Sequence, residues 1–539
     1  MQNTKSGKLS LATVVVVMIS AMILTSCNTP TEPVSTENSA EGSSAFSSSS
    51  SDMTPVPTLS APDSSEPISS EHDLSSDPDI QSSSESSSFS LPVSSNSSSG
   101  RASSAPTSST PDPTPTDEPP LIDNRNFDFN GPIPKDVLNN YLSRAVTHNG
   151  LAAFAGYGNV PAGGNPDFED DFRMLINIGA MFIGRAAHVW GYADDTFHYN
   201  EAARIADIVH DHDPRIILQA CVFEAVYKDN VNAISIPSWV FQAFDMPVEN
   251  RKFRYSDMLF TQGLYVDQWG TNGSIPDLTR LETQMWFYYR CAKYIDAGYE
   301  AIHLGQLSPM TRLDPGKLQL AALLSKVRAY AAEHARRKWV ILDAHIYSAG
   351  EATYIKSGKV HLLLDFHSFP LRPKDNFTGS KTASDGFQPA ILEKNFGDAI
   401  YGRSAGGIHP AGWETDYNPF LCEFDNSGYD KLNRDKNLGG MWPWGYDEIT
   451  WFSKQPPKRR DEILIDFYAW INTNYTYGNI QMPTRVPLAF PFTVYYESEE
   501  YGSTPFNNIH FFKANTQSPN SLTSFSLEKT IKNIWRIAN

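Results

Sequence analysis

The chain has 539 residues and a formal net charge of −18, and its charged, serine and aromatic residues are too unevenly distributed for one uniform globule. Residues 28–122 carry a net charge of −13, residues 123–539 carry −7, and all 11 Trp and 24 Tyr lie in 123–539. Aromatic side chains build cores and binding surfaces, so residues 123–539 are predicted to contain the folded part. A nucleic-acid reader is excluded, because no basic stripe is present to displace counterions.

Residues 1–27 have the pattern of an export signal. Two lysines precede an apolar run, 11–24, that is too short to span a bilayer as a helix. The segment ends in Leu-Thr-Ser-Cys at Cys27, which resembles the bacterial lipobox. This resemblance implies lipidation of Cys27 and a mature protein anchored to the outer side of the bacterial cell membrane. An unmodified signal peptide is the alternative.

Residues 28–122 consist mostly of Ser, Pro, Thr and acidic residues, with Phe46 and Phe89 as the only aromatics. Such a composition buries too little apolar area to offset chain entropy, so a disordered linker is expected. A linker of this kind holds a domain away from the cell surface. It indicates a partner or substrate too large to diffuse into the cell.

Residues 123–539 alternate between short apolar runs and longer segments of helical period, which predicts βα units around a parallel sheet. The expected strands are 151–157, 180–189, 215–223, 300–307, 339–346, 360–367, 419–424 and 486–492. The expected helices are 168–178, 200–212, 279–297, 315–337 and 459–474, with a closing helix at 527–537. Eight strands with helices between them favour an α/β fold of the (β/α)8 TIM-barrel type in one domain. No glycine-rich dinucleotide loop follows the first strand, and no cofactor is expected.

Polar side chains recur at the ends of the expected strands, where the chemistry of such barrels is located. They are Arg185, His188, Trp190, Glu224, His303, Gln306, Asp343, His345, Tyr347, Asp365, His367, Glu423 and Asp425. Placed together at one rim, they predict a binding or catalytic site.

The seventh expected strand ends in Phe-Leu-Cys-Glu-Phe-Asp, with Glu423 as its glutamate. This segment resembles strand seven of the clan A (cellulase-like) glycoside hydrolases, whose nucleophile is a Glu in this position. The resemblance implies a barrel enzyme that cleaves an extracellular poly- or oligosaccharide through two carboxylates. Those families place an Asn-Glu pair at the end of strand four, whereas this chain has His303-Leu304-Gly305-Gln306. A glutamine cannot donate the required proton, so the acid is expected to be Glu224 or, as the second choice, Asp365.

Aromatic and polar residues around these carboxylates are expected to bind the sugar rings. The substrate-binding candidates are Arg185, His188, Trp190, His303, Gln306, His345, Tyr347, His367, Asp425, Trp442 and Trp444. Further aromatics lie in the long loop 225–277, at Trp239, Phe241, Phe244, Tyr265 and Trp269. Both retaining and inverting separations of the carboxylates remain open.

Once Cys27 is assigned to lipid, three cysteines remain, Cys221, Cys291 and Cys422, and they are expected to be buried free thiols. Two other functions remain open. The Asp-x-His patterns at Asp343 and Asp365 would suit a metal-dependent barrel hydrolase, although no metal is expected because the first strand lacks a His-x-His pair. The missing strand-four glutamate would suit a non-catalytic, glycan-binding barrel.

Overall fold

The computed structural model describes residues 119–155, 163–191, 194–346, 349–370, 373–374, 391–392, 405–425, 448–498 and 502–537. They all belong to one compact unit, Ser108–Asn539. The predicted signal peptide and most of the predicted linker lie outside this part of the chain. Near the start of the described residues, the carbonyl of Pro119 accepts a hydrogen bond from Lys532 Nζ.

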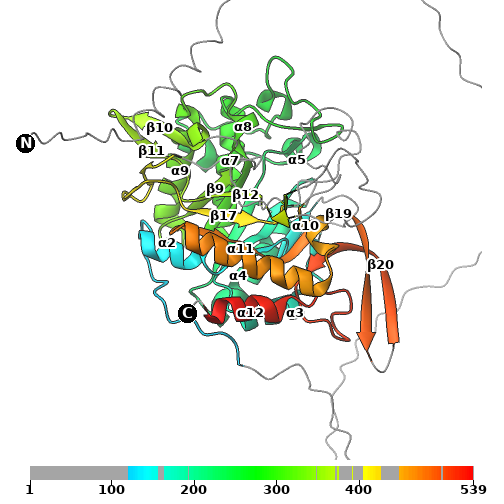
Figure 1. The fold of residues 1–539 in the computed structure, drawn as a ribbon. Coiled ribbons are helices and arrows are strands. Elements are labelled where there is room, and N and C mark those ends of the chain that lie inside the picture. The colour runs from blue at the N-terminus through cyan, green and yellow to red at the C-terminus, as the bar shows by residue number, and fades with distance from the viewer. Residues whose placement is uncertain are drawn as a thin grey trace, which may run out of the picture. The chain divides into compact units, whose positions relative to one another are not determined.

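The unit is a mixed α/β fold around a large sheet (Figure 1). The strands of this sheet are β1 (Ala145–His148), β2 (Ala153–Ala155), β3 (Gly163–Gly164), β4 (Phe182–Val189), β5 (Ile217–Val222), β8 (Ala301–Gln306), β9 (Ile341–His345), β12 (His367–Pro370), β17 (Phe420–Glu423), β18 (Gly478–Ile480), β19 (Met482–Ser498) and β20 (Gly502–Lys513). The strand order is β18-β17-β12-β9-β8-β5-β4-β1-β19-β20, and every neighbouring pair is parallel except β19 with β20.

Helices and 3-10 turns connect the strands. They are α2 (Lys135–Leu142), α3 (Phe168–Ile178), α4 (Asp195–His212), α5 (Lys228–Ala233), α6 (Ser238–Ala243), η1 (Tyr255–Met258), α7 (Leu281–Asp296), α8 (Leu307–Met310), α9 (Leu318–His334), η2 (Ala349–Ala352), α10 (Glu448–Ser453), α11 (Pro457–Asn474) and α12 (Glu528–Ile537). All six predicted helices are confirmed within a few residues. Among the described residues, no helix is both long and apolar enough to cross a membrane.

Smaller sheets lie outside the main one. They are β10 (Thr353–Lys356) with β11 (Lys359–Leu362), β15 (Gly407–Ile408) and β16 (Glu414–Thr415); β13 (Pro373–Lys374) with β14 (Ile391–Leu392); and β6 (Val226–Tyr227) with β7 (Gly273–Ser274). Cys221, Cys291 and Cys422 are buried free thiols, which confirms that prediction.

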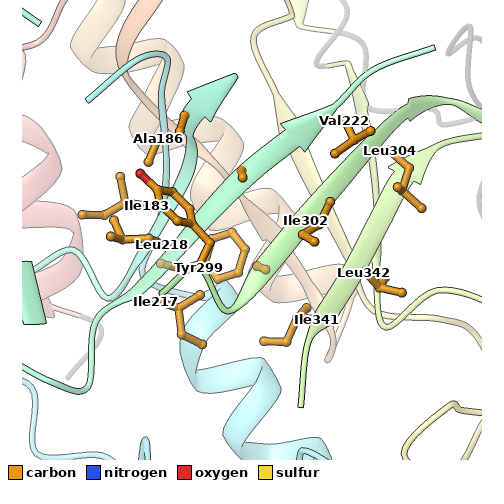
Figure 2. Close-up of a cluster of buried hydrophobic side chains, with 14 of the residues drawn as sticks. Ile183, Ala186, Ile217, Leu218, Val222, Tyr299, Ile302, Leu304, Ile341 and Leu342 are labelled. Carbon is orange, nitrogen blue, oxygen red and sulfur yellow. The ribbon is translucent and has the colours of Figure 1, made fainter. Parts of the chain in front are cut away.

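The central strands carry apolar and polar residues in alternation. Figure 2 shows Leu218, Ile302 and Leu342 as members of one buried apolar cluster, on β5, β8 and β9. The next residue on each of these strands is polar and also buried: Gln219, His303 and Asp343. Successive side chains of a strand point to opposite faces, so one face of the sheet builds the apolar core and the other gathers polar groups.

Gln481 is the residue between two strands that stand far apart in this strand order. Gln481 separates β18, which pairs with β17, from β19, which pairs with β1. Its backbone N–H donates to the carbonyl of Cys422 on β17 (2.8 Å), and its side-chain Nε2 donates to the carbonyl of Val146 on β1 (3.0 Å). One residue is thus hydrogen-bonded to both β17 and β1.

Two strand predictions are wrong. The first parallel strand in the chain is Ala145–His148 rather than 151–157. Within the described part of the expected segment, 151–155, Ala153–Ala155 forms β2 beside β4. The expected strand 360–367 divides between β11, in a separate sheet, and β12, which begins at His367.

Candidate active site

Glu423 ends β17 and is fully buried on the polar face of the sheet. Its Oε1 accepts hydrogen bonds from Arg185 Nη2 and His345 Nε2, both at 2.6 Å. Burial alone would raise the pKa of Glu423, but the charge of Arg185 and the hydrogen bond from His345 outweigh it and lower the pKa to about 2. Glu423 is therefore ionised at neutral pH. Its second oxygen, Oε2, is buried and finds no hydrogen-bond donor among the described residues.

Arg185 reaches Glu423 from an irregularity in β4. Its backbone has φ of 60°, a left-handed conformation uncommon for a residue with a side chain, and the register of β4 against β5 shifts between Ile183 and Ala187. The backbone N–H of Arg185 donates to Oε1 of Gln219 (3.0 Å), which holds the irregular segment in place. Strain of this kind is concentrated at functional sites.

Glu224 lies two residues beyond the end of β5 and is 2% exposed. Its Oε2 accepts a hydrogen bond from the backbone N–H of Gln306 (2.9 Å), at the end of β8. The carboxyl group therefore lies against the end of the fourth parallel strand, where this chain has no acid of its own. Burial raises the pKa of Glu224 more than its hydrogen bonds and the charge of His345 lower it.

Gly305 provides the space for this carboxyl group. Its φ is 65°, and a Cβ built at this position would overlap Oε2 of Glu224. A side chain here would thus be strained by the backbone and would displace Glu224. From the sequence, Gln306 was noted only as a residue that cannot serve as the acid. In the structure, its backbone N–H binds the carboxyl group of Glu224.

His345 connects the two carboxyl groups. It pairs in register with Gln306, whose N–H binds Glu224, and its own ring donates to Glu423. Burial acts to lower the pKa of His345, but the hydrogen bond to Glu423 and the charges of Glu423 and Asp425 raise it. His345 thus donates to one of two buried glutamates with opposite pKa shifts, and its charge lowers the pKa of the other.

Other predicted site residues join this cluster. Asp425 Oδ1 lies 4.0 Å from Arg185 Nη1. His303 packs its ring against that of His345, with centroids 4.9 Å apart, and His188 contacts Phe223. Burial, followed by the charge of Arg185, lowers the pKa of His188 to about 3, so its ring is neutral.

Trp190 lies at the outer end of the same group. Its ring contacts Phe223 and Trp269 at centroid separations of 5.2 and 5.0 Å. Trp269 is the one loop aromatic that joins the cluster through such a contact. Phe241 is in the apolar core, and Trp239 packs on Tyr289 of α7.

Asp365 and His367 are placed differently from expectation, because β12 begins at His367 and both residues therefore stand before the strand or at its start. The carboxylate of Asp365 accepts hydrogen bonds from Arg328, Trp339 and the backbone of Leu342. His367 packs beside Phe369 and Phe420. The contacts of Asp365 are those of a structural carboxylate that ties α9 to the sheet.

Four predicted residues, Cys27, Tyr347, Trp442 and Trp444, lie outside the described residues. Three of the side chains considered for metal binding are engaged otherwise: Asp343 pairs with His303, His345 with Glu423, and Asp365 with Arg328. Within the described ranges, no group of three or more His, Cys, Asp or Glu side chains could hold a metal ion.

Replacing Gly305 tests whether the site depends on the placement of Glu224. We expect Gly305→Ala to lower the thermal midpoint more than Gly263→Ala, measured by circular dichroism. Both glycines have similar φ, 65° and 72°, so both variants suffer the ~1–2 kcal/mol of left-handed strain, but only Gly305 meets another group within 4 Å. Equal losses in the two variants would show that Glu224 moves aside freely.

In comparisons with known proteins, no protein-family model matches this chain, and no curated protein matches it.

Proposed function

We propose that this protein is a glycoside hydrolase that uses Glu423 and Glu224 as its two carboxyl groups. The observation that carries the proposal is the pair of buried glutamates whose surroundings shift their pKa values in opposite directions around His345. Glycoside cleavage needs one ionised and one protonated carboxyl beside the scissile bond. Environments that separate the pKa values of two acids in this way assign the two roles.

In this proposal, Glu423 is the nucleophile or the base. Arg185 and His345 occupy Oε1 and fix the carboxylate, whereas Oε2 has no donor among the described residues and is the oxygen directed to attack. A buried carboxylate oxygen without a hydrogen-bond donor is costly, and a catalytic role is one reason for such an oxygen to persist.

Glu224 is the general acid. It lies against the end of β8, so its carboxyl takes the place of the missing strand-four glutamate without being part of that strand. Its raised pKa keeps the proton available for the leaving oxygen at higher pH than an exposed glutamate would. No cofactor is required for this chemistry.

We also propose that the parallel sheet closes as a (β/α)8 barrel. Gln481 supports closure, since it separates β18 from β19 and bonds to both β17 and β1. The convergence of side chains from β4, β8, β9 and β17 on Glu423 is also what the mouth of a barrel would produce.

The placement of the protein is proposed from its sequence. Residues 1–27 would act as a lipoprotein signal with Cys27 as the lipid anchor, and 28–122 as a spacer for a catalytic domain at 123–539. An enzyme held outside the membrane would act on a saccharide chain at or near the cell surface.

The test is release of reducing ends from polysaccharides by the full chain. We expect hydrolysis of at least one member of a panel of cellulose, xylan, mannan, laminarin and chitin, with equal rates in the presence and absence of EDTA. Loss of activity with EDTA would favour a metal-dependent hydrolase. Binding without release would favour a non-catalytic glycan-binding barrel, and either result would contradict the two-carboxylate mechanism.

A further inference from the structure

Asp343 on β9 and His303 on β8 form a second hydrogen-bonded pair, next to His345. Asp343 is 1% exposed, and its Oδ2 lies 2.8 Å from Nδ1 of His303. The hydroxyl of Ser368 donates to the same oxygen at 3.3 Å. Neither Asp343 nor Ser368 contacts Glu423 or Glu224 through a hydrogen bond among the described residues, so the pair acts through His303.

The orientation of the Gln219 side-chain amide shows that Asp343 accepts a hydrogen bond from it. Gln219 accepts the backbone N–H of Arg185 with Oε1, so its other amide atom is Nε2, a donor. This Nε2 donates to Oδ1 of Asp343 at 2.6 Å. One oxygen of Asp343 is therefore an acceptor, and the other faces an imidazole nitrogen that can either give or take a proton.

His303 has one nitrogen left for other use. Its Nε2 is buried and has no hydrogen-bond partner among the described residues, while the ring is held between His345 and Phe223, with centroids at 4.9 and 5.9 Å. Burial, together with the charge of His345, keeps the pKa of His303 well below its usual value. Burial also raises the pKa of Asp343 well above the usual value, so burial favours the neutral form of both groups.

We propose that Asp343 is a positioning residue, which donates its carboxyl proton to Nδ1 of His303 and so holds the ring in the neutral form protonated on Nε2. The histidine then presents one N–H donor on the face of the sheet that carries Glu423. This proposal deepens the glycosidase proposal and rests on it for the ligand, which is a neutral sugar hydroxyl. A neutral donor binds such an acceptor without adding a further positive charge near Arg185.

The pair of variants Asp343→Asn and Asp343→Leu separates this role from a structural one. In Asp343→Asn, the amide Nδ2–H replaces the carboxyl proton donor to His303, and Oδ1 still accepts from Gln219. We expect the asparagine variant to keep kcat/KM within tenfold of the parent. Asp343→Leu removes the donor and should lose about 10- to 100-fold, the usual cost of removing a group that orients an imidazole.

If the proton instead lies on Nδ1 of His303, a large loss of activity is expected in Asp343→Asn. If Asp343 were an ionised acceptor of an Nδ1 proton, Asp343→Asn would force the wrong tautomer, a change that costs about 10⁴-fold in the Ser-His-Asp triad. A loss of that size in Asp343→Asn would overturn the proposal. Because the asparagine variant keeps the shape and the hydrogen bonds to His303 and Gln219, losing only the long one from Ser368, it remains informative even where the leucine variant fails to fold.

The tautomer itself is read without any substrate. In the full chain labelled with ¹⁵N-histidine, long-range ¹H–¹⁵N correlations identify which ring nitrogen carries the proton, and His303→Gln identifies the signal by its loss. We expect protonation on Nε2 alone, unchanged in Asp343→Asn. Protonation on Nδ1, or on both nitrogens, would overturn the proposal. Failure of the wild-type chain to hydrolyse any glycan would overturn the proposed function, while the tautomer would still decide this inference.

Discussion

Glu423→Gln is expected to lower turnover at least about 10³-fold on any glycan that the wild-type chain hydrolyses, within the range usual for loss of a catalytic group. The amide keeps the shape of the carboxylate but carries no charge, so it can neither attack nor activate water. The measurement is the initial rate of reducing-end release. Glu414→Gln is the matched control, since Glu414 is exposed on β16, and it should leave the rate unchanged.

The same change removes the counter-charge of buried Arg185, which has a stability cost separate from catalysis. Breaking a buried ion pair by removing one partner costs roughly 3–5 kcal/mol, so the variant must be shown to be folded by circular dichroism at the assay temperature. Because the pKa of Glu423 is lowered, its contribution to stability is present above the pKa of the unfolded chain and is lost as pH falls toward about 2. A folded Glu423→Gln variant with turnover within tenfold of the parent would remove Glu423 from the mechanism.

Glu224→Gln is expected to reduce hydrolysis of unactivated glycans by about 10²- to 10⁴-fold, because the leaving oxygen is no longer protonated. Dinitrophenyl glycosides, whose leaving group needs little protonation, should be affected far less. The alkaline limb of the pH profile should also disappear, since it reports deprotonation of Glu224. An unchanged profile, or equal losses on both kinds of substrate, would mean that another group supplies the proton.

The raised pKa of Glu224 also has a thermodynamic sign that can be measured without substrate. The folded state holds this proton at pH values where the unfolded chain has already released it, so the stability contributed by Glu224 falls as pH rises between the two pKa values. Glu224→Gln should therefore unfold at a higher temperature than the wild type at neutral pH, and at a similar temperature at acidic pH, where Glu224 is protonated in both states. Glu414→Gln again provides the comparison.

The helices were predictable because their signal is local. Helices α3 and α11 show amphipathic spacing that needs no knowledge of the rest of the chain, and the predicted bounds are within two residues of the observed ones. The central strands β4, β5, β8 and β9 were also found, since each is a short buried run. Apolar and polar side chains alternate along β5, β8 and β9, so their polar residues lie on one face of the sheet.

The two strands that were predicted wrongly, β1 and β12, depend on partners far away in the sequence. β1 has only four residues, and two of them, Thr147 and His148, are polar, yet all four are buried. The buried ring of His148 is hydrogen-bonded to Thr484 and Asp171, which lie far away in the sequence. A hydropathy pattern therefore favours the apolar segment that follows it. In the same way, the apolar residues before Asp365 suggested a strand, whereas β12 itself contains His367 and Ser368 and is specified by pairing with β9 and β17.

The positions of polar residues at strand ends indicated that Glu423 would have polar neighbours, but they did not indicate how Glu423 is held. Glu423, Arg185 and His345 were placed together because each ends or interrupts a strand. The support from Gln219 and Asp343 depends on amide orientation and on register across β4, β5 and β9, which no single segment encodes. The need for a glycine at position 305 depends on the carboxyl group of Glu224, which comes from a different strand end and fills the space that a Cβ would take.

Helix α12 contains the last described residues and contacts the segment just before β1. The carbonyl of Trp535 accepts a hydrogen bond from buried Arg144, immediately before β1, and Glu528 pairs with Arg173 of α3. During synthesis on the ribosome, Arg144 therefore stays uncovered until Trp535, 391 residues further along the chain, has been made. Removal of α12 should expose the beginning of the fold to proteases, so the N-terminal βα unit completes its fold only after α12 has been synthesised.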